Sequence, residues 1–287
     1  MKSRRMQDLT VLELKNYLAN AEHKTIIIPY ALSEQHGYHL PLDVDIRNAD
    51  FCSAKLAEKL DCLIAPTLNY TFSGGLLTGT INVKPNTFSN LVGEIIESLA
   101  LQGFENFIVL PGHGGSESML HLKESLRIQK WLNPMLKDKM IIMLPIWDFS
   151  PTWMELFQKR DYHAALAETS LLLHWCPEVV RKDMIQTDVE EVAERLRSDP
   201  DSYQLRESYT ELSQEVVQTT QREDVVIGVM GYPEQATAEL GAKIESEFME
   251  NASQALLKAI ADAAEARKSG KRITHDNGAA LKILNEL

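Results

Sequence analysis

Carboxylates and histidines stand close together near the start of the chain, in the segment Ser33-Glu34-Gln35-His36-Gly37-Tyr38-His39-Leu40-Pro41-Leu42-Asp43-Val44-Asp45. Carboxylate oxygen and neutral imidazole are ligands suited to Zn, Mn or Fe, and the segment has no cysteine that would indicate a structural zinc site. Glu34 and His36 are two residues apart, so in an extended chain both side chains point to the same side. Gly37 and Pro41 can fold the chain back and bring in Asp45. The alternative interpretation is a polar loop with surface carboxylates and a helix-capping aspartate.

A single histidine lies between glycines in a second segment, Pro111-Gly112-His113-Gly114-Gly115-Ser116. Glycine lets the backbone approach a ligand closely and adopt positive φ. The sequence predicts a helix that begins at about Ser116, so the N–H groups of Gly114, Gly115 and Ser116 can face an anion or a developing oxyanion. The alternative is a strand-to-helix turn with an incidental histidine.

A third candidate carboxylate, Glu168, stands beside a run of leucines in the segment His163-Ala164-Ala165-Leu166-Ala167-Glu168-Thr169-Ser170. A carboxylate on a helix that looks buried needs a partner for its charge, and a metal ion is one such partner. His163 and Glu168 are five residues apart, about 140° on an ideal helix. They can converge on one site only if His163 lies at or before the first turn. Otherwise His163 flanks the helix and Glu168 is solvated.

Three further residues admit two interpretations each. His39 could orient a ligand, but a packed and hydrogen-bonded histidine explains it as well. Trp147 and Trp153 follow an apolar run and could form the wall of a pocket for a flat or cyclic substrate. Ordinary core packing explains them equally, because tryptophans are largely buried in most proteins.

Short apolar runs alternate with amphipathic segments along the chain, and the strands and helices that they predict hold the candidate residues in place. The apolar runs predict buried strands at 24–30, 62–68, 105–111, 139–146 and 224–230. The amphipathic segments predict helices at 8–20, 47–60, 88–102, 117–132 and 234–267. This alternation predicts an α/β fold with a mostly parallel sheet covered on both faces. Ligands of such sheets bind beyond the carboxyl ends of the strands, where the first two segments lie.

The organisation of the chain indicates one domain, residues 1–267, followed by a C-terminal tail, residues 268–287. Residues 198–223 are polar and weakly periodic, which predicts an excursion from the domain, such as a lid or a subunit contact, rather than a linker.

Composition excludes several classes of function. With 29 basic and 41 acidic residues the net charge is -12, which argues against nucleic-acid binding. The longest apolar runs are strand-sized, far short of the roughly 20 residues of a membrane span, and the basic start is interrupted by charges, unlike a signal peptide. Three cysteines without a CxxC pair fit a reducing compartment. We therefore expect a cytoplasmic protein that binds neither membranes nor nucleic acids.

Taken together, these motifs resemble those of the creatininase (creatinine amidohydrolase) family. The resemblance covers roughly residues 20–260. It is carried by Glu34-Gln35-His36-Gly37-x-His39-Leu40-Pro41-Leu42-x-x-Asp45, by Gly112-His113-Gly114-Gly115, by His163-Ala164 with Glu168-Thr169-Ser170, and by Gly231-Tyr232-Pro233 with Ala236-Thr237 and Gly241.

The resemblance implies a three-layer α/β/α fold, two divalent metal ions (Zn, Mn or Fe) and a homo-oligomer, with a hexamer as the expected form. In creatininases proper one ligand is a glutamate two residues after the histidine of the second motif, a position that here holds Gly115. Other members resemble this chain in having a glutamate in an ETS motif, which is Glu168 here. The implied metal ligands are therefore Glu34, His36, Asp45, His113 and Glu168, with Asp45 bridging the ions.

The residues and the resemblance together predict a dinuclear metal-dependent hydrolase that acts on a small-molecule substrate. We expect a metal-bridging hydroxide to attack a carbonyl and cleave a C–N bond in a small cyclic amide or a formamide. His163 is expected to carry a proton to the leaving group. Asp43, Leu166 and the segment 73–80 differ from the residues usual in the family, which argues against creatinine itself as the substrate. Two alternatives remain: hydrolytic ring opening, by C–C cleavage, of a cyclic keto-polyol such as an oxidised inositol, and a non-catalytic metal-binding protein.

Overall fold

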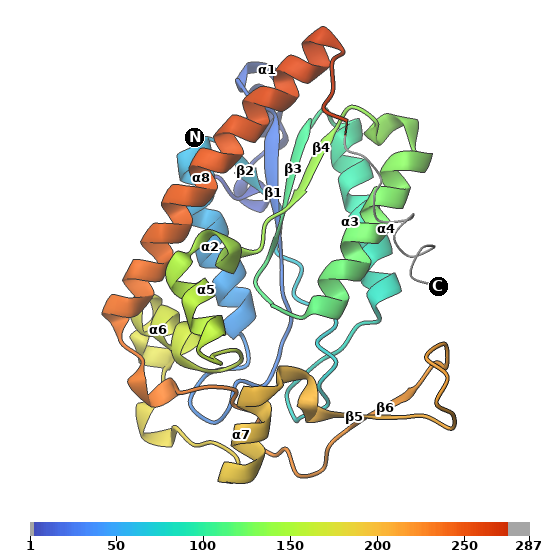
Figure 1. Ribbon diagram of the computed structural model, residues 1–287. Helices are drawn as coiled ribbons and strands as arrows, with labels where there is room; N and C mark the ends of the chain where they lie inside the picture. The colour runs from blue at the N-terminus through green and yellow to red at the C-terminus, as the bar shows by residue number, and fades with distance from the viewer. Residues whose placement is uncertain (1–2, 275–287) are drawn as a thin grey trace.

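A four-stranded parallel sheet forms the centre of the molecule (Figure 1), which confirms the predicted sheet. The computed structural model describes residues 3–274, apart from the side chain of Ser116. The strands lie in the order β2-β1-β3-β4, and β1 pairs in parallel with both β2 and β3. Their bounds are Thr25–Tyr30 for β1, Leu63–Ile64 for β2, Asn106–Pro111 for β3 and Met140–Met143 for β4.

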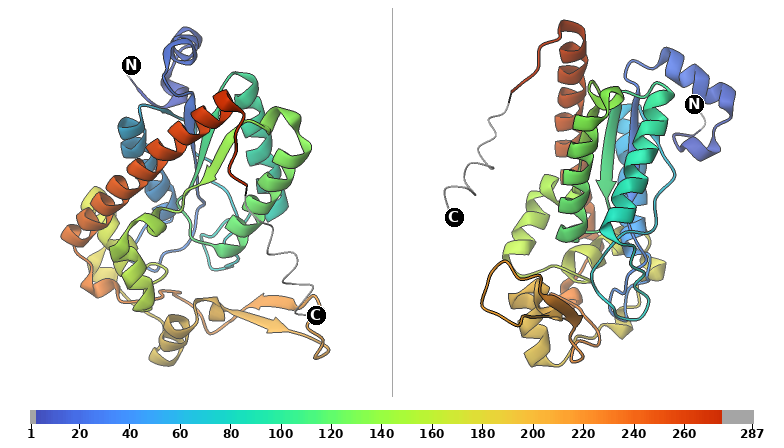
Figure 2. Two further views of the ribbon diagram at one scale, coloured as in Figure 1. Left: turned by 45° about the horizontal axis from the view of Figure 1, so that its top comes forward. Right: turned by 90° about the vertical axis from the view of Figure 1, so that its right-hand side faces the viewer.

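Helices cover both faces of the sheet, as predicted (Figure 2). They are α1 (Val11–Asn20), α2 (Val44–Leu60), α3 (Pro85–Leu101), α4 (Ser116–Leu132), α5 (Pro151–Gln158), α6 (Leu166–Trp175) and α8 (Ala238–Ser269). Alternate strand side chains point to opposite faces. Ile27 and Ile108 therefore pack in a core with α2, α5, α6 and α8, while Ile26 and Phe107 pack in a second core with α1, α3 and α4.

Local signals in the sequence set the ends of these helices. Thr10 and Glu13 form a capping box at the start of α1, which satisfies two backbone groups that the helix leaves unpaired. The side chain of Thr237 accepts a hydrogen bond from the N–H group of Leu240 at the start of α8. Gly270 adopts a left-handed conformation and ends α8. The predicted tail begins within the last turn of α8, and residues 275–287 lie outside the described part of the chain.

The predicted strand at 224–230 is wrong, because this segment is a loop. Its backbone N–H groups bind a side chain instead of a neighbouring strand. The carboxylate of Asp188 accepts hydrogen bonds from the N–H groups of Val226, Ile227 and Gly228, at 2.7, 2.9 and 2.7 Å. Gly228 also has a φ of 75°, which is incompatible with an extended strand. Val225 and Met230 of this segment pack against Val192 and Leu196 rather than within the sheet.

We expect Asp188→Asn to lower the free energy of unfolding by about 2–4 kcal/mol, because a buried carboxylate that accepts several N–H groups would become an amide with a single acceptor oxygen. Denaturation in urea measures this difference. The matched control is Asp183→Asn at an exposed position nearby, where the change should stay within about 0.5 kcal/mol. Equal stability of the two variants would contradict the anchoring role of Asp188.

The excursion that the sequence predicted at residues 198–223 is present, and it begins slightly earlier, with a helix at residue 190. This part contains α7 (Glu190–Ser198), a 3-10 turn at Pro200–Tyr203, and the antiparallel hairpin of β5 (Gln204–Glu207) and β6 (Gln218–Gln221). Figure 1 shows α7 below the carboxyl ends of the central strands and the hairpin projecting to one side. Further short 3-10 turns lie at Met6–Asp8, Pro134–Leu136, Ile146–Phe149, Pro177–Val179, Lys182–Met184 and Pro233–Gln235.

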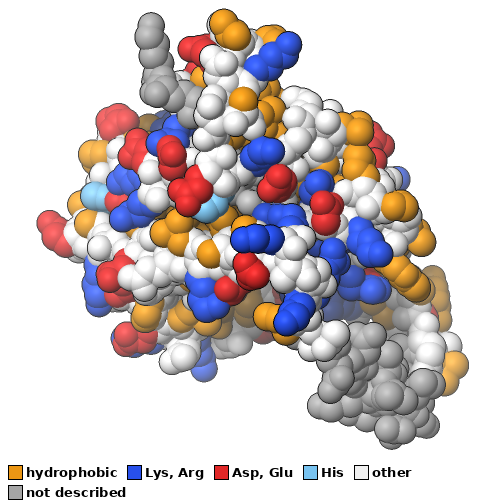
Figure 3. Space-filling model, turned by 90° about the horizontal axis from the view of Figure 1, so that it is seen from above, with side chains coloured by type: hydrophobic (Ala, Val, Ile, Leu, Met, Phe, Trp, Pro, Cys, Tyr) orange, Lys and Arg blue, Asp and Glu red, His pale blue; other side chains and the backbone are white. Residues whose placement is uncertain are grey.

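The opposite end of the molecule, above the amino ends of the strands, carries charged side chains of both signs with hydrophobic ones between them (Figure 3). Within residues 3–274, every group of side chains arranged to hold a metal ion lies at the carboxyl ends instead. Among the same residues, no helix combines the length and the apolar character that crossing a membrane requires.

Candidate active site

The loop after β1 brings Glu34 and His36 under the carboxyl end of the sheet. The N–H group of Glu34 bonds the carbonyl oxygen of Leu42 at 3.0 Å, which closes the loop. Gly37, with a φ of 64°, turns the chain back towards α2, and Asp45 lies in the first turn of that helix. The side chains of Glu34, His36 and Asp45 are all buried. The fold back at Gly37 that the sequence predicted is therefore present.

The tautomer of His36 follows from its contact with the backbone. Its Nδ1 lies 3.1 Å from the carbonyl oxygen of Glu34, which can only accept a hydrogen bond, so Nδ1 carries the hydrogen. The lone pair of a neutral His36 then lies on Nε2. That atom is 3.4 Å from Asp45 Oδ1 and 3.7 Å from Glu168 Oε2. A nitrogen lone pair that faces two carboxylates is favourable only with a proton or a metal cation between them.

His113 faces the other side of the same aspartate. Its Nδ1 lies 3.0 Å from Glu34 Oε2 and 3.2 Å from Asp45 Oδ2. Glycine is required on both sides of this ring. A Cβ atom on Gly112 would lie 2.0 Å from the carbonyl oxygen of Asp45, and one on Gly115 would lie 2.3 Å from His113 Nε2. No side chain fits at position 115 without displacing the His113 ring.

Glu168 reaches the cluster from the first turn of α6. Asp161 positions that turn, because its carboxylate accepts hydrogen bonds from the N–H groups of Leu166 and Ala167. Ala164 has a φ of 52° and donates its N–H group to Glu168 Oε2 at 2.6 Å. His163 precedes the helix, which is the condition under which it can share a site with Glu168.

The charges of the cluster perturb the pKa values of its members. Burial lowers the pKa of His113, but the carboxylates of Glu34 and Asp45 outweigh burial and raise it to about 10. The pKa of His36 is likewise raised well above its ordinary range, since Asp45 and Glu168 outweigh burial. Burial raises the pKa of Glu34, but the neighbouring histidines hold it well below its usual value. The same balance of burial and histidines lowers the pKa of Glu168. The carboxylates of this buried cluster therefore favour a positive charge beside them, which a proton on a histidine or a metal ion supplies.

The chemistry of these donors fits metal ions. Glu34 Oε2, Asp45 Oδ2 and His36 Nε2 are buried atoms without a hydrogen-bond partner among the described residues. Buried polar atoms of this kind are costly unless something binds them. Two of the groups arranged to hold an ion share Asp45: Glu34 with Asp45 and His113, and His36 with Asp45 and Glu168. The structure thus brings together all five side chains that the sequence singled out as metal ligands.

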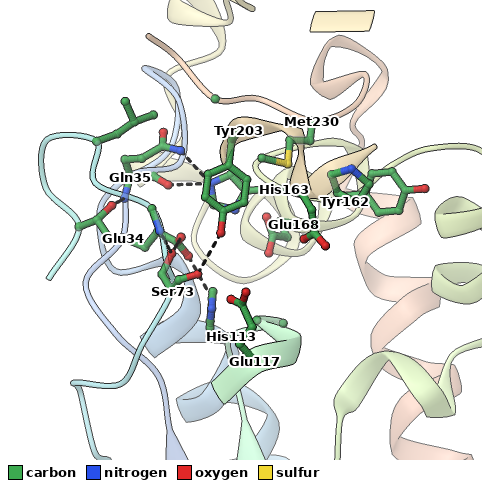
Figure 4. A pocket seen from close by; sticks show the side chains of 18 of the residues that line it. Glu34, Gln35, Ser73, His113, Glu117, Tyr162, His163, Glu168, Tyr203 and Met230 are labelled. Atoms are coloured by element: carbon green, nitrogen blue, oxygen red, sulfur yellow. Dashed lines mark hydrogen bonds and ion pairs between the residues drawn. The ribbon is translucent and has the colours of Figure 1, made fainter. Parts of the chain in front are cut away.

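His163 lies beside this cluster and faces the cavity (Figure 4). Its ring centroid is 4.3 Å from that of His36, and together with Glu34 these residues form a third group that could hold an ion. His163 Nε2 contacts the carbonyl oxygen of Gln35 at 2.7 Å and the side-chain Nε2 of Gln35 at 3.1 Å. The contact with the carbonyl oxygen requires a hydrogen on His163 Nε2, whereas the contact with the amide nitrogen requires a lone pair there.

The turn after His113 supplies further polar groups. Gly114 and Gly115 line the cavity, and α4 begins at Ser116, as predicted. The N–H groups of the two glycines donate to no acceptor among the described residues. They stand next to the amino end of α4, where backbone N–H groups attract negative charge. The side chain of Ser116 lies outside the described part of the chain.

The remaining sequence candidates pack nearby. His39 is fully buried and its Nε2 lies 3.1 Å from Thr169 Oγ1, while burial and the neighbouring His36 lower its pKa to about 4. His39 therefore fits the interpretation of a packed and hydrogen-bonded histidine. Trp147 and Trp153 meet both interpretations, since they pack with the core and also line the cavity.

Sequence patterns did not identify three other side chains at the site. The hydroxyl of Ser73 donates a short hydrogen bond to Glu34 Oε1, and the hydroxyl of Tyr203 donates to the carbonyl oxygen of Ser73 at 3.4 Å. Glu117, in the first turn of α4, also lines the cavity. Glu117 looked like an ordinary acidic residue of a first helical turn. No local signal linked Ser73 to Glu34, because 39 residues separate them.

Most of the chain matches one known protein family. The creatininase family, described as creatinine amidohydrolase, matches residues 7–256. The chain belongs to the creatininase family. The predicted resemblance is therefore confirmed, and with it the predicted enzyme class, a metal-dependent amidohydrolase.

Two relatives of this chain differ in the substrate that their names give. The chain is 24% identical to the creatinine amidohydrolase of Pseudomonas putida over 175 residues, which are 56% of this chain and 67% of that protein. It is 28% identical to the mycofactocin precursor peptide peptidase of Mycobacterium ulcerans (strain Agy99) over 240 residues, which are 79% of this chain and 82% of that protein.

Solved creatininases share the fold. The crystal structure of a creatinine amidohydrolase has a TM-score of 0.72 at 19% identity and covers 91% of this chain and 99% of its own. Two further creatininase structures, a manganese form and a variant of the Zn–Zn type, each have a TM-score of 0.70, at 20% and 21% identity, and cover 90% and 91% of this chain and 99% of their own. The predicted three-layer fold is thus confirmed.

Proposed function

We propose that this creatininase-family enzyme holds two divalent metal ions and hydrolyses a C–N bond of an amide. The observation that carries the proposal is the position of Asp45, whose two carboxylate oxygens face different histidines. One ion would be held by Glu34, Asp45 and His113, and the other by His36, Asp45 and Glu168. Carboxylate and imidazole ligands suit Zn, Mn or Fe. Solved creatininases of a manganese form and of a Zn–Zn type support this choice of metals.

When bound, such a pair of ions would lower the pKa of a water molecule and polarise the substrate carbonyl. The protein's own groups would supply the rest of the catalysis. His163, which Gln35 holds beside the ligand cluster, would take up a proton and deliver it to the leaving nitrogen. The backbone N–H groups of Gly114, Gly115 and Ser116 would donate to the carbonyl oxygen as it becomes negative.

The substrate class favoured first is a small cyclic amide or a formamide. The cavity above the cluster has a volume of about 480 Å³, within the range of small-molecule sites. Aromatic side chains form one wall and would exclude water from the reacting bond. A flat ring could lie against Trp147, which lines the cavity close to Gly114.

A peptide bond is a second candidate, and a specific observation favours it. The match to the mycofactocin precursor peptide peptidase covers 79% of this chain, against 56% for the creatinine amidohydrolase. An amide within a short peptide requires the same attack on a carbonyl and the same protonation of a leaving nitrogen. The ligand residues therefore suit both substrates.

Product analysis separates the candidates. Full-length protein reconstituted with Zn²⁺, Mn²⁺ or Fe²⁺ would be incubated with lactams, formamides, short peptides and keto-inositols. Release of an amine from any amide substrate supports the proposal. Turnover of keto-inositols alone would replace it with ring opening by C–C cleavage, and metal binding without any turnover would favour a non-catalytic role.

We expect Ser73→Ala to weaken metal binding about 10- to 100-fold, the usual effect of removing a hydrogen bond that orients a metal ligand. Ser73 donates to Glu34 Oε1, so the other oxygen of Glu34 is held towards His113. Calorimetric titration of metal-free protein with Zn²⁺ measures the affinity. Ser269→Ala, at the exposed end of α8, is the matched control and should bind as the unchanged protein does. Equal affinities would exclude an orienting role for Ser73.

We also propose a cytoplasmic homo-oligomer. The β5–β6 hairpin projects from the domain and leaves Tyr209 and Val216 almost fully exposed, which is typical of surfaces that contact another subunit. The three cysteines, Cys52, Cys62 and Cys176, are free and buried, as expected in a reducing compartment. Light scattering on the purified protein gives its mass, and a monomer at all concentrations would exclude the oligomer.

A further inference from the structure

The cavity above the ligand cluster carries a charge pattern that bears on the substrate. The ligand candidates Glu34, His113 and Glu168 line one end of this cavity, here called its inner end, and Tyr203 and Met230 also line the cavity (Figure 4). The substrate amide must reach this inner end to react. The rest of the substrate must then lie along the walls and the rim of the cavity.

One wall is aromatic and apolar. Trp147 and Trp153 meet edge to face with ring centroids 6.1 Å apart, and Phe157 stacks on Tyr162 with centroids 6.0 Å apart and an interplanar angle of 16°. All four line the cavity, together with Met230. Such a wall gains free energy from a large apolar or aromatic group and offers no compensation for a buried charge.

The rim is acidic. Besides the carboxylates of the ligand cluster, two carboxylates line the cavity, those of Glu117 and Asp201. No lysine or arginine belongs to the described lining. Both carboxylates face water, with side chains 46% and 64% exposed. Glu117 lines the cavity beside His113 (Figure 4). A Cβ atom on Gly74 would lie only 3.4 Å from Glu117 Oε2, so this carboxylate lies close to the Ser73 segment.

One arginine compensates these two carboxylates incompletely. Arg206 Nη2 lies 3.8 Å from Glu117 Oε1 and 3.9 Å from Asp201 Oδ2. Both distances exceed those of a hydrogen-bonded ion pair. One positive charge shared between two negative charges leaves the rim with an excess of one negative charge. A substrate anion at the rim would be repelled, whereas an amide N–H or a cation could donate to the free carboxylate oxygens.

On the basis of the proposed amidohydrolase function, we infer that Glu117 and Asp201 select substrates by the charge that a substrate carries at the rim of the cavity. Beyond the scissile amide, the substrate carries an apolar or aromatic group that lies against the aromatic wall. The part of the substrate at the rim is uncharged or cationic. A free carboxylate at that position selects against binding. Within the peptide class, the expected substrates are internal or C-terminally amidated segments rather than peptides that end in a free carboxylate beside the scissile bond.

Matched pairs of compounds that differ only in this charge test the inference. We would use N-acetylglycyl-phenylalaninamide with N-acetylglycyl-phenylalanine, and N-formyl-phenylalaninamide with N-formyl-phenylalanine. For the metal-loaded, full-length protein, calorimetry gives the affinity for each compound, and product analysis gives kcat/KM where turnover occurs. The ratio of the amide value to the acid value measures the charge preference. A failure of the proposed function leaves all four compounds intact, while the affinity ratio still reports on the rim.

Variants test which residues cause the preference for the amides. The expected changes in the ratio have the size typical of partly exposed charges. The unchanged protein should prefer the amides about fivefold or more. The double variant Glu117→Gln/Asp201→Asn should reduce the ratio to about two or less. Arg206→Gln should raise the ratio about threefold, because both carboxylates lose their partner. Glu124→Gln, also on α4 but paired with Arg127 away from the cavity, is the matched control and should leave the ratio unchanged.

Opposite changes in the double variant and in Arg206→Gln support the inference, because loss of shape alone would not move the ratio in both directions. Acids that bind as tightly as the amides, or more tightly through the inner end of the cavity, would overturn it. A ratio that stays constant in both variants would overturn it as well.

Discussion

Asp45→Ala should abolish binding of both metal ions and lower kcat/KM by about 10³–10⁵-fold. Asp45 is the side chain shared by the two ligand groups, with Oδ1 facing His36 and Oδ2 facing His113. Metal ions stabilise the transition state of amide hydrolysis by several kcal/mol, and each 1.4 kcal/mol corresponds to about a factor of ten in rate. Elemental analysis after reconstitution gives the metal content, and steady-state kinetics give the rate.

The control for Asp45→Ala lies two residues away. Asp43 precedes α2 and forms a partly exposed ion pair with Arg47, so Asp43→Ala should retain both ions and most of the activity. Circular dichroism of both metal-free variants shows whether they fold. An Asp45→Ala protein that folds and keeps two ions per chain at full activity would falsify the dinuclear site.

Glu168→Gln should leave one tightly bound metal ion in place of two, and lower kcat/KM by about 10³-fold or more. A glutamine at this position can still accept the hydrogen bond from the N–H group of Ala164, so the turn that begins α6 is preserved. An amide oxygen is a much weaker ligand than a carboxylate, so only the group formed by His36, Asp45 and Glu168 loses affinity.

The matched control is Glu178→Gln, at an exposed position shortly after α6. It should bind two ions and react as the unchanged protein does. Competitive titration with a coloured chelator counts the ions and ranks their affinities. Two equally tight ions in Glu168→Gln would show that another side chain completes the second group, and His163 would be the first candidate.

Much of the fold could be predicted because each element carries a local signal. The strands that hold the site are short apolar runs, and turns rich in glycine and polar residues follow them directly. Parallel strands place all their carboxyl ends at one edge of the sheet, so the loops with Glu34 and His113 had to meet there. Spacing alone could not bring in Glu168. Its convergence depends on the positive φ of Ala164 and on the helix start held by Asp161.

The sequence did not predict residues whose conformation or role depends on contacts with distant parts of the chain. The apolar segment 224–230 has the composition of a buried strand, yet Asp188 holds its backbone in a loop. Ser73 meets Glu34 only after the chain has folded, and Glu117 resembles any acidic residue of a first helical turn. In each case a partner far away in the sequence decides the conformation or the role, and a single sequence does not reveal that partner.

The excursion, which ends at residue 223, and the loop 224–230 after it have a consequence for how such enzymes diversify. The five proposed ligands come from loops and helix ends that belong to the sheet and its covering helices. Asp201 and Tyr203 of the excursion, and Val225 and Met230 of the loop 224–230, line the cavity instead. Insertions or replacements in these segments could therefore alter substrate choice while the reactive machinery stays intact. A laboratory evolution campaign confined to the excursion should yield new specificities far more often than one directed at the strands.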